Sequence, residues 1–260
     1  MNDQTVFLTA GRNVSGPYWL VKYNTRTRRE IWRADLTRFT QAKYAGFQDV
    51  TVDARGNSYI IGTYPGSILR IDKSGKRITA WYPPQTTDNT KHGYAGVDSV
   101  GETLLVADAN GVPEGVNEGN SEIYRFDMTG EEGRPVLIPR SPTGIKLGIP
   151  DSLRLPERYG GTVMLMGENY VGVTVLRSLD GWQTAEQLGT IKSDFPRFPD
   201  RLMSSTVQIG ERQFMFGQIF PDEIVPGTKG GNITDFPFFD ITDQVEELLR
   251  GKGEYALDLK

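Results

Sequence analysis

Ile149-Pro150-Asp151-Ser152 is one of four short segments that align with one another along the chain. The others are Phe47-Gln48-Asp49-Val50, Gly96-Val97-Asp98-Ser99 and Phe198-Pro199-Asp200-Arg201. Their aspartates are spaced 49, 53 and 49 residues apart. Each segment leads into an apolar-rich strand and then a turn that contains Gly or Glu. A fixed period of about fifty residues indicates an array of structural repeats.

Each repeat contains further short strands. Second strands are predicted at 58–62, 103–107, 162–167 and 213–217, third strands at 68–72, 123–127 and 236–240, and fourth strands at 78–82 and 135–138. Four short strands per repeat at this period are typical of propeller blades. We therefore expect a single all-β domain, a β-propeller of the six-bladed type with about five blades visible. The repeats are 1–40, 41–86, 87–140, 141–192 and 193–260.

The first repeat lacks its inner strand. Residues 5–11 match a second strand and 18–23 match a third, with no first strand before them. A propeller must close its ring or expose long sheet edges. We therefore expect the N-terminal part of the propeller, roughly 60–90 residues at this repeat length, to be missing. At the other end, 245–249 has helical periodicity and predicts a short terminal helix.

Composition narrows the classes of function. The net charge of −4 gives no basic surface for nucleic acid, and no run of 18 apolar residues predicts a transmembrane segment. The absence of cysteine excludes disulfides, thiolate metal sites and cysteine nucleophiles. Two sequons, Asn13-Val14-Ser15 and Asn232-Ile233-Thr234, give weak support for secretion. The oligomeric state stays open.

A propeller gathers two sets of loops on one face, those that enter the inner strands and those that follow the second strands. Binding residues concentrate on such loops. The aromatic candidates are Tyr44, Tyr64, Tyr94, Tyr170 and Phe198, and the polar candidates are Asp108, Asn110, Glu168, Asn169 and Gln218. The tyrosine rings offer apolar walls with hydroxyl donors, although packing between blades would also explain them.

The repeated aspartates have two interpretations. Asp49, Asp98, Asp151 and Asp200 would form a ring that holds a cation or a polar ligand. Alternatively, each accepts backbone N–H bonds and fixes its own repeat. Recurrence in four repeats favours the structural role, because chemistry needs a break in the symmetry. Ser178 to Thr184 resembles the Asp-box of sialidases but occupies a third-to-fourth-strand turn, so we predict a structural role there too.

His92 is the only histidine and breaks the symmetry of the repeats. Its unperturbed pKa lies near neutrality, so it is a candidate general acid or base, with Tyr64 and Tyr94 as further proton donors. The alternative is an incidental loop histidine. The sequence contains no Gly-x-Ser-x-Gly elbow, no His-Glu-x-x-His helix and no phosphate-binding glycine loop.

Two stretches carry a family resemblance. The first, 46–57 followed by 66–72, resembles the six-bladed gluconolactonases and strictosidine-synthase-like proteins. Gluconolactonases hold a metal through a Glu, two Asn and an Asp, a set that has no clear match here. The second, 144–153 together with 232–242, looks like a fungal propeller family. That family includes the propeller protein of trichothecene gene clusters, a secreted Malassezia allergen and the hetero-Diels–Alderases of tropolone sesquiterpenoid pathways.

The resemblance implies a cofactor-free pericyclase of fungal specialised metabolism. Its substrate would lose water from a hydroxymethyl tropolone, and the resulting quinone methide would add to a terpene alkene. The ligand would then be a small hydrophobic or terpenoid molecule, and the protein would be secreted. Two alternatives stay open: a non-catalytic binder of lipids or hydrophobic metabolites, and a metal-dependent lactonase or hydrolase.

Overall fold

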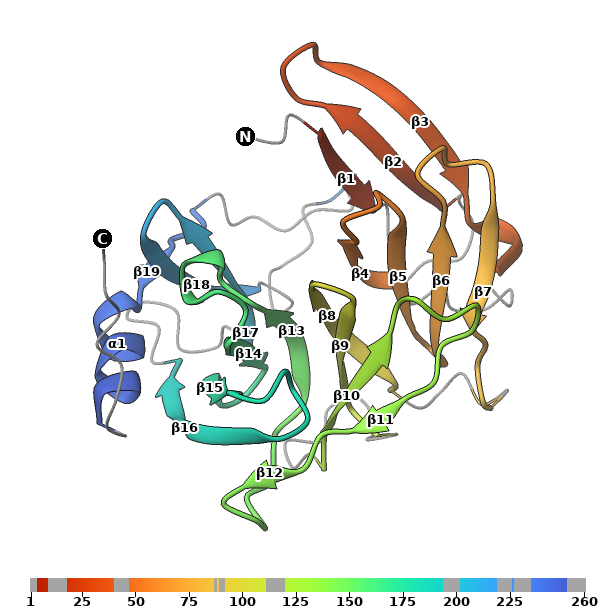
Figure 1. The fold of residues 1–260 in the computed structure, drawn as a ribbon. Helices are drawn as coiled ribbons and strands as arrows, with labels where there is room; N and C mark the ends of the chain where they lie inside the picture. The colour runs from red at the N-terminus through yellow and green to blue at the C-terminus, as the bar shows by residue number, and fades with distance from the viewer. Residues whose placement is uncertain are drawn as a thin grey trace. The chain divides into compact units, whose positions relative to one another are not determined.

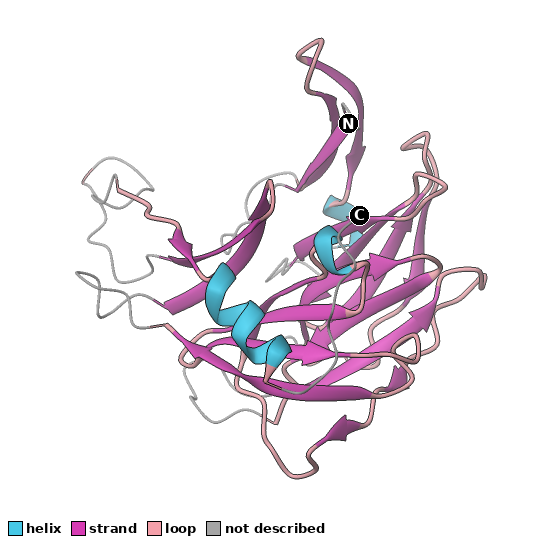
Figure 2. Cartoon of the chain, turned by 60° about the vertical axis from the view of Figure 1, so that its left-hand side comes forward, coloured by secondary structure: helices cyan, strands magenta, loops and turns pink. Residues whose placement is uncertain are grey.

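The computed structural model describes residues 4–8, 18–39, 47–86, 88, 92–110, 120–193, 202–218, 226 and 235–251. Figure 1 traces the fold, and Figure 2 shows that strands account for most of the regular structure. The all-β class is therefore confirmed. The chain divides into two compact units, Met1–Leu137 and Ile138–Lys260. The expected single domain stays a prediction, and each unit is described by itself.

The first unit contains three antiparallel sheets (Figure 1). The first sheet has the order β1-β2-β3, with β1 (Gln4–Leu8), β2 (Trp19–Asn24) and β3 (Arg29–Asp35), and a 3-10 turn follows at Thr37–Phe39. The second is β4 (Phe47–Val52), β5 (Ser58–Thr63), β6 (Gly66–Ile71) and β7 (Ile78–Tyr82). The third is β8 (Tyr94–Val100), β9 (Thr103–Asp108), β10 (Glu122–Asp127) and β11 (Val136–Leu137). The four-strand repeat is thus confirmed for repeats two and three.

The sequence explains the hairpins of these sheets. Every residue of β5 is buried, as expected for a strand covered on both faces. The turn after β6 is built on Asp72, which accepts hydrogen bonds from Ser74 Oγ at 2.9 Å and from Lys76 N at 3.0 Å. Gly75 supplies the left-handed backbone conformation there, with φ of 74°.

The second unit contains two sheets and a helix. The first sheet has the order β12-β16-β15-β14-β13, with β12 (Arg140–Ser141), β13 (Pro150–Arg154), β14 (Val163–Glu168), β15 (Gly172–Arg177) and β16 (Ala185–Lys192). A 3-10 turn lies at Glu157–Tyr159. The second sheet joins β17 (Leu202–Ile209), β18 (Arg212–Gln218) and β19 (Phe239–Asp240), and α1 (Thr242–Arg250) follows. Sequence reasoning missed β12, a parallel edge strand on β16.

Two predicted strands are shorter than expected. The third strand of the last repeat, predicted at 236–240, begins only at Phe239, because Pro237 has no N–H to donate to a ladder. The fourth strand predicted at 135–138 is reduced to Val136–Leu137. The terminal helix is confirmed as α1, which buries Val245 and Leu249 against the core of the second unit.

The inner strands β4, β8, β13 and β17 each contain a β-bulge. Aligning the repeats on these bulges matches equivalent positions better than aligning them on the aspartates. The bulges fall between Phe47 and Asp49, Tyr94 and Gly96, Pro150 and Ser152, and Met203 and Ser205. Measured from the bulge, the described aspartates occupy different places: Asp151 is in it, Asp49 follows it directly, and Asp98 comes later. The residues paired with the position before each bulge are Gly62, Asp108, Glu168 and Gly217. Two repeats therefore place a carboxyl at one shared register position.

Candidate functional site

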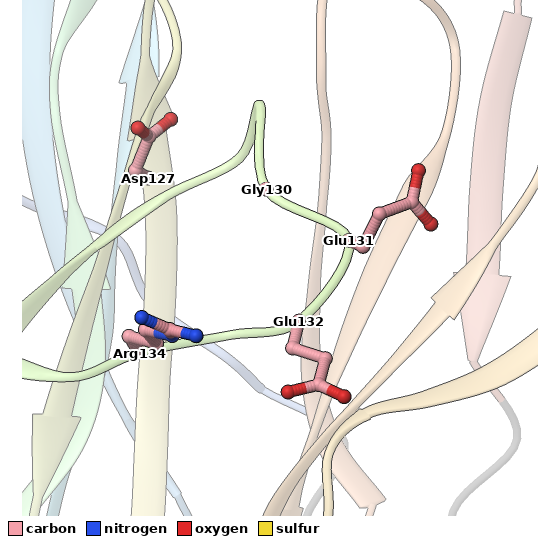
Figure 3. Close-up of a pocket in the computed structure, with 5 residues that line it drawn as sticks. All are labelled: Asp127, Gly130, Glu131, Glu132 and Arg134. Carbon is pink, nitrogen blue, oxygen red and sulfur yellow. The ribbon is translucent and has the colours of Figure 1, made fainter.

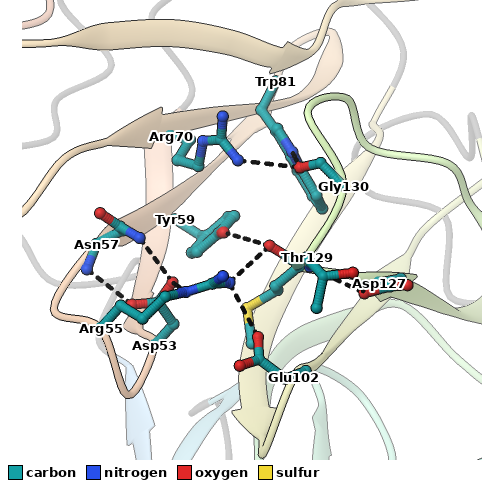
Figure 4. Close-up of polar contacts among 11 residues, drawn as sticks. Asp53, Arg55, Asn57, Tyr59, Arg70, Trp81, Glu102, Asp127, Thr129 and Gly130 are labelled. Carbon is teal, nitrogen blue, oxygen red and sulfur yellow. Dashed lines mark hydrogen bonds and ion pairs between the residues drawn. The ribbon is translucent and has the colours of Figure 1, made fainter.

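Repeats two and three meet along an interface with two chemically different ends. We call the first the arginine end, formed by Arg55, Arg70 and Trp81 against the turn after β10 (Figure 4). Arg55 donates to Met128 O at 2.8 Å and pairs with Glu102 at 2.9 Å. Gly130 O accepts hydrogen bonds from Arg70 at 3.0 Å and from the Trp81 indole at 3.1 Å. Cations and an indole thus satisfy the turn carbonyls, so this end fixes the repeats together.

A surface hollow of about 500 Å³ lies at the same turn (Figure 3). Its lining is Asp127, Gly130, Glu131, Glu132 and Arg134. Figure 3 shows that the charged side chains spread from the turn and do not converge on one point. Hydrogen bonds from Thr129 lower the pKa of Asp127, which indicates a turn-forming carboxylate.

At the opposite end of the same strands, three loops are joined through Gly93. Gly93 N donates to Thr63 O at 2.8 Å, and Ala109 N donates to Gly93 O at 2.9 Å. The Thr63 hydroxyl also donates to Tyr94 O at 2.7 Å. These bonds bring together segments that carry Tyr64, His92 and Asp108, all three predicted from the sequence.

His92 and Tyr64 form an aromatic pair. Their ring centroids lie 5.0 Å apart with an interplanar angle of 15°, so the rings are stacked. Both side chains are half-buried. The only histidine of the chain is thus held against a tyrosine from the neighbouring repeat, and the catalytic role of the two residues stays a prediction.

Asp108 faces a second acid. The β9–β10 register pairs Asp108 with Glu122, and directly opposed residues of an antiparallel pair have neighbouring side chains. Asp108 accepts a hydrogen bond from Asn110 N at 2.8 Å, while Glu122 accepts one from the Tyr124 hydroxyl at 2.6 Å. Among the described residues, no cation pairs with Asp108. Burial raises the pKa of Asp108 to about 6; the Asn110 N–H opposes that rise and the charge of Glu122 adds to it.

Tyr94 differs from the expectation. It is only 4% exposed and packs in an aromatic cluster with Tyr82 at 5.9 Å and Phe126 at 6.3 Å between ring centroids. Burial, with Tyr82 and Asp108 nearby, raises the pKa of its hydroxyl well above the usual value. Tyr94 therefore packs in the core beside the carboxyls, and its role as a proton donor stays a prediction that its burial does not favour.

The inner-strand aspartates connect neighbouring strands. Asp49 accepts backbone N–H bonds from Val50 at 2.9 Å and from Val97 of β8 at 3.3 Å. Asp98 accepts from Ser99 N at 2.8 Å and from the Thr51 hydroxyl of β4 at 3.3 Å. Both therefore bridge β4 and β8, which agrees with the structural interpretation.

In the second unit, Glu168 and Asn169 have structural partners. Glu168 is 2% exposed and accepts hydrogen bonds from Gly148 N and the Thr174 hydroxyl. Burial raises its pKa, opposed by these two bonds and by the charge of Arg140. The Asn169 amide donates to Met203 O at 3.0 Å. These contacts give Glu168 and Asn169 structural roles, and their binding of substrate stays a prediction.

The remaining candidates fall into three groups. Tyr44, Phe198 and Asp200 lie outside the described residues, as does the side chain of Gln218, the last residue of β18. Tyr170 is 42% exposed and stays a prediction, as does Asp151 in the β13 bulge. Asn110 is exposed and uses its backbone to form the turn at Asp108.

Sequence reasoning missed Glu122, Tyr124 and Tyr82. Glu122 and Tyr124 alternate with the buried Ile123 along the third strand of their repeat, so both belong to one face. That alternation was available in the sequence. The pairing of Glu122 with Asp108 was not, because the long loop between β9 and β10 leaves the register of the two strands undetermined.

The other site predictions have simple outcomes. Asp180 lies in the turn between β15 and β16, where hydrogen bonds from Thr184, and further ones from Ser178 and Gln183, lower its pKa to about 2. The structural role of the Asp-box-like turn is confirmed. Within the described ranges, no group of three or more His, Cys, Asp or Glu side chains is arranged to hold a metal ion. No helix there has the length and apolarity to cross a membrane.

Two fungal proteins are similar to this chain in sequence. Trichothecene biosynthesis protein 14 of Trichoderma arundinaceum is 31% identical over 256 residues, covering 94% of this chain and 65% of that protein. The core trichothecene cluster protein 14 of Fusarium sporotrichioides is 29% identical over 257 residues, covering 96% and 64%. The chain is similar in sequence to these trichothecene cluster proteins. It spans slightly less than two thirds of their length, and no family model matches it.

The fold has a solved counterpart. The Malassezia sympodialis allergen Mala s 1 superposes with a TM-score of 0.68 at 15% identity, covering 92% of this chain and 73% of that one. At this identity the likeness shows the fold alone. The β-propeller class expected from the repeats is therefore confirmed, although the number of blades in the complete ring stays a prediction.

Proposed function

We propose that this protein, which is similar to trichothecene cluster protein 14, works in fungal specialised metabolism, where it catalyses loss of water from a tropolone-type substrate and the hetero-Diels–Alder cycloaddition of the product with a terpene. The observation that supports this proposal best is the Tyr64–His92 stack, whose chain segments are joined through Gly93 to the segment that carries Asp108. A histidine stacked on a tyrosine, with a half-buried carboxyl on the adjoining segment, suits an apolar ligand that must gain and lose protons.

The chemistry requires one acid and one base. An acid donates a proton to the ligand's hydroxymethyl oxygen, the C–O bond breaks and water leaves. A base removes the proton of the ring hydroxyl, which leaves a neutral quinone methide. That species adds to an alkene with one new C–C bond and one new C–O bond. Holding both partners in one site can supply ~7–11 kcal/mol of the barrier, so no cofactor is needed.

In this proposal His92 donates the first proton and Tyr64 holds its ring. The stacked geometry fixes the imidazole plane against the phenol ring, with centroids 5.0 Å apart. A fixed plane limits the directions in which a ring nitrogen can donate, which favours one orientation of the leaving hydroxyl.

The test is turnover of a hydroxymethyl tropolone with a macrocyclic terpene alkene, followed by mass spectrometry. We expect a product whose mass is the sum of the two partners less one water. His92→Ala should lower the rate ~10²–10⁴-fold, the usual contribution of a general acid or base. Asp127→Asn, an exposed turn acid at the arginine end, is the matched control and should retain the rate. A rate equal to that in buffer, with a folded wild-type protein, would contradict catalysis.

Simple ligand binding is the second candidate, and the half-buried Tyr64–His92 pair favours it as much as it favours catalysis. If the protein only binds its ligand, addition of a hydrophobic terpenoid should quench the tyrosine fluorescence of the protein. The terpenoid should then be recovered chemically unchanged. Under that outcome His92→Ala would alter affinity only. For the metal-dependent hydrolase alternative, the described residues offer no donor set.

A further inference from the structure

We propose that Asp108 and Glu122 form a coupled carboxyl pair that acts as the base of this site, with Tyr124 as the residue that positions Glu122. The pair would take its proton from a ligand with an acidic hydroxyl, such as an enol, a phenol or a tropolone. The identity of the ligand rests on the proposed function. The coupling of the two carboxyls does not, because it is a property of the protein without ligand.

The geometry comes from the strand register. Asp108 ends β9 and pairs with Glu122 at the start of β10, so the two side chains lie on the same face of one hairpin. The hydroxyl of Tyr124 donates to Glu122 at 2.6 Å, and Asn110 N donates to Asp108 at 2.8 Å. Each carboxyl therefore has one neutral donor, and each also has the other acid opposite it.

The surroundings are aromatic. Tyr94 of β8 pairs with Asp108 from the other side, and Tyr82 of β7 lies 5.9 Å from Tyr94 between ring centroids. Among the described residues, the titratable groups near Asp108 are Glu122 and Tyr124 from β10, Tyr94 from β8 and Tyr82 from β7. These four groups are neutral or acidic. Burial in these surroundings, with the charge of Glu122 opposite, therefore raises the pKa of Asp108.

Exposure separates this pair from a purely structural one. Asp108, Glu122 and Tyr124 are all half-buried, so each keeps part of its surface open to solvent. Burial and the charge of Glu122 hold the pKa of Asp108 near 6, and a base is most effective when its pKa lies near the working pH. In the proposed step the ligand O–H bond breaks, the proton moves to a carboxylate oxygen of Asp108, and the electron pair stays on the ligand oxygen. Water then takes the proton back.

The first experiment measures the pair without ligand, by carbon-13 NMR titration of the carboxyl groups in the full chain. We expect one carboxyl to titrate near pH 6 in the wild-type protein. The Asp108→Asn variant should lose that titration, and Glu122→Gln should move it down by about one pH unit, because the neighbouring charge is gone. Asp127→Asn, on the same strand at the arginine end, should leave it unchanged. A wild-type protein with no carboxyl titrating above pH 5 would overturn the pair.

The second experiment measures its role through the pH profile of turnover. We expect Asp108→Asn to lower the rate by ~10²–10⁴-fold and Glu122→Gln to shift the acid limb downward by about one pH unit with a retained maximum. Tyr124→Phe should also shift that limb, and a merely structural role would not move it. If the NMR titration is as expected but no variant alters the profile, the role as base fails. If the wild-type protein titrates as expected but turns nothing over, only the proposed function fails.

Discussion

Asp108 and Glu168 occupy the same register position in consecutive repeats. Each ends a second strand and pairs with the residue that precedes the bulge of its inner strand, Tyr94 for Asp108 and Pro150 for Glu168. Burial raises the pKa of both. The two carboxyls differ in the side chains around them.

Glu168 is surrounded by groups that favour its charge. Gly148 N and the Thr174 hydroxyl donate to its two oxygens, and Arg140 adds a favourable charge. Asp108 has one backbone donor, Asn110 N, and an acid opposite. The first arrangement stabilises one conformation of a buried side chain, while the second leaves a half-buried group prone to exchange a proton.

The difference shows how a repeat protein can acquire a site. Its repeats supply equivalent positions, and a structural carboxyl becomes a chemical one where its donors are replaced by another acid. The arginine end makes the same point within one interface, because its backbone carbonyls are satisfied by Arg55, Arg70 and Trp81. The stabilising contacts and the proposed reactive groups therefore lie at opposite ends of the same strands.

The largest expected effect is on stability. Glu168→Ala should lower the free energy of unfolding by ~4 kcal/mol, because it removes the acceptor of two buried donors and leaves a cavity. Asp108→Ala should cost less than ~1 kcal/mol, because its loss also removes an unfavourable burial of charge. Urea unfolding at pH 7 measures both, with Glu168→Gln as a control that keeps the volume. An equal loss of unfolding free energy in the two alanine variants would contradict the difference between the two carboxyls.

The pH dependence of stability is the next largest effect. The folded protein binds a proton at Asp108 more tightly than the unfolded chain does, since the pKa rises from 3.8 to about 6. The associated stability is fully present below pH 3.8 and is lost as the pH rises through 6. Asp108→Asn cannot ionise, so relative to wild type it should gain up to ~3 kcal/mol between pH 4 and pH 7, less any screening by solvent.

A matched control gives the opposite sign. The pKa of Asp127 is lowered by its bonds to Thr129, so its contribution is present above its unfolded pKa and lost as the pH falls. Asp127→Asn should therefore lose stability relative to wild type as the pH rises. Urea midpoints at about pH 2.5, 4, 5.5 and 7 would separate the two variants, because the change for Asp127 falls below pH 3.8 and the change for Asp108 falls between pH 3.8 and about 6. Parallel curves for both would contradict the assignment of Asp108.

Asp98 extends the comparison to a third carboxyl. Its acceptor contacts, Ser99 N at 2.8 Å and the Thr51 hydroxyl at 3.3 Å, resemble those of Glu168. Asp98→Ala should therefore cost ~1–2 kcal/mol, and Asp98→Asn less, because it keeps one acceptor oxygen. Thermal unfolding of the two variants measures this difference. Negligible effects of both would count against the bridge between β4 and β8.

The fold was predictable from the sequence because the repeat period and the buried second strands are local patterns. Strands β5, β9, β14 and β18 lie where the apolar runs predict them. Alignment on the aspartates did not give the correct register, since a β-bulge adds a residue that the sequence does not mark. The parallel strand β12 was also missed, because its partner β16 is distant in sequence.

The site was predictable only in part. His92, Tyr64 and Asp108 were chosen for their chemistry and their place at loop starts, and the structure brings their segments together. Tyr94 was chosen by the same rule but is buried, because it begins an inner strand next to Phe126. Glu122 depends on a strand pairing across a long loop, which no local pattern specifies.

The smallest expected effect concerns the hydroxyl of Tyr124. Its hydrogen bond at 2.6 Å holds the Glu122 carboxyl in place opposite Asp108. Tyr124→Phe should cost ~0.5–1.5 kcal/mol and move the titration of Asp108 downward by less than about one pH unit, because the neighbouring acid is then held less firmly beside Asp108. The corresponding change beside the other carboxyl, Thr174→Val, removes a donor from Glu168 and should destabilise without altering the titration near pH 6. Carbon-13 NMR of both variants makes the measurement. Should Thr174→Val move that titration and Tyr124→Phe leave it unchanged, the two carboxyls would have exchanged the roles assigned to them.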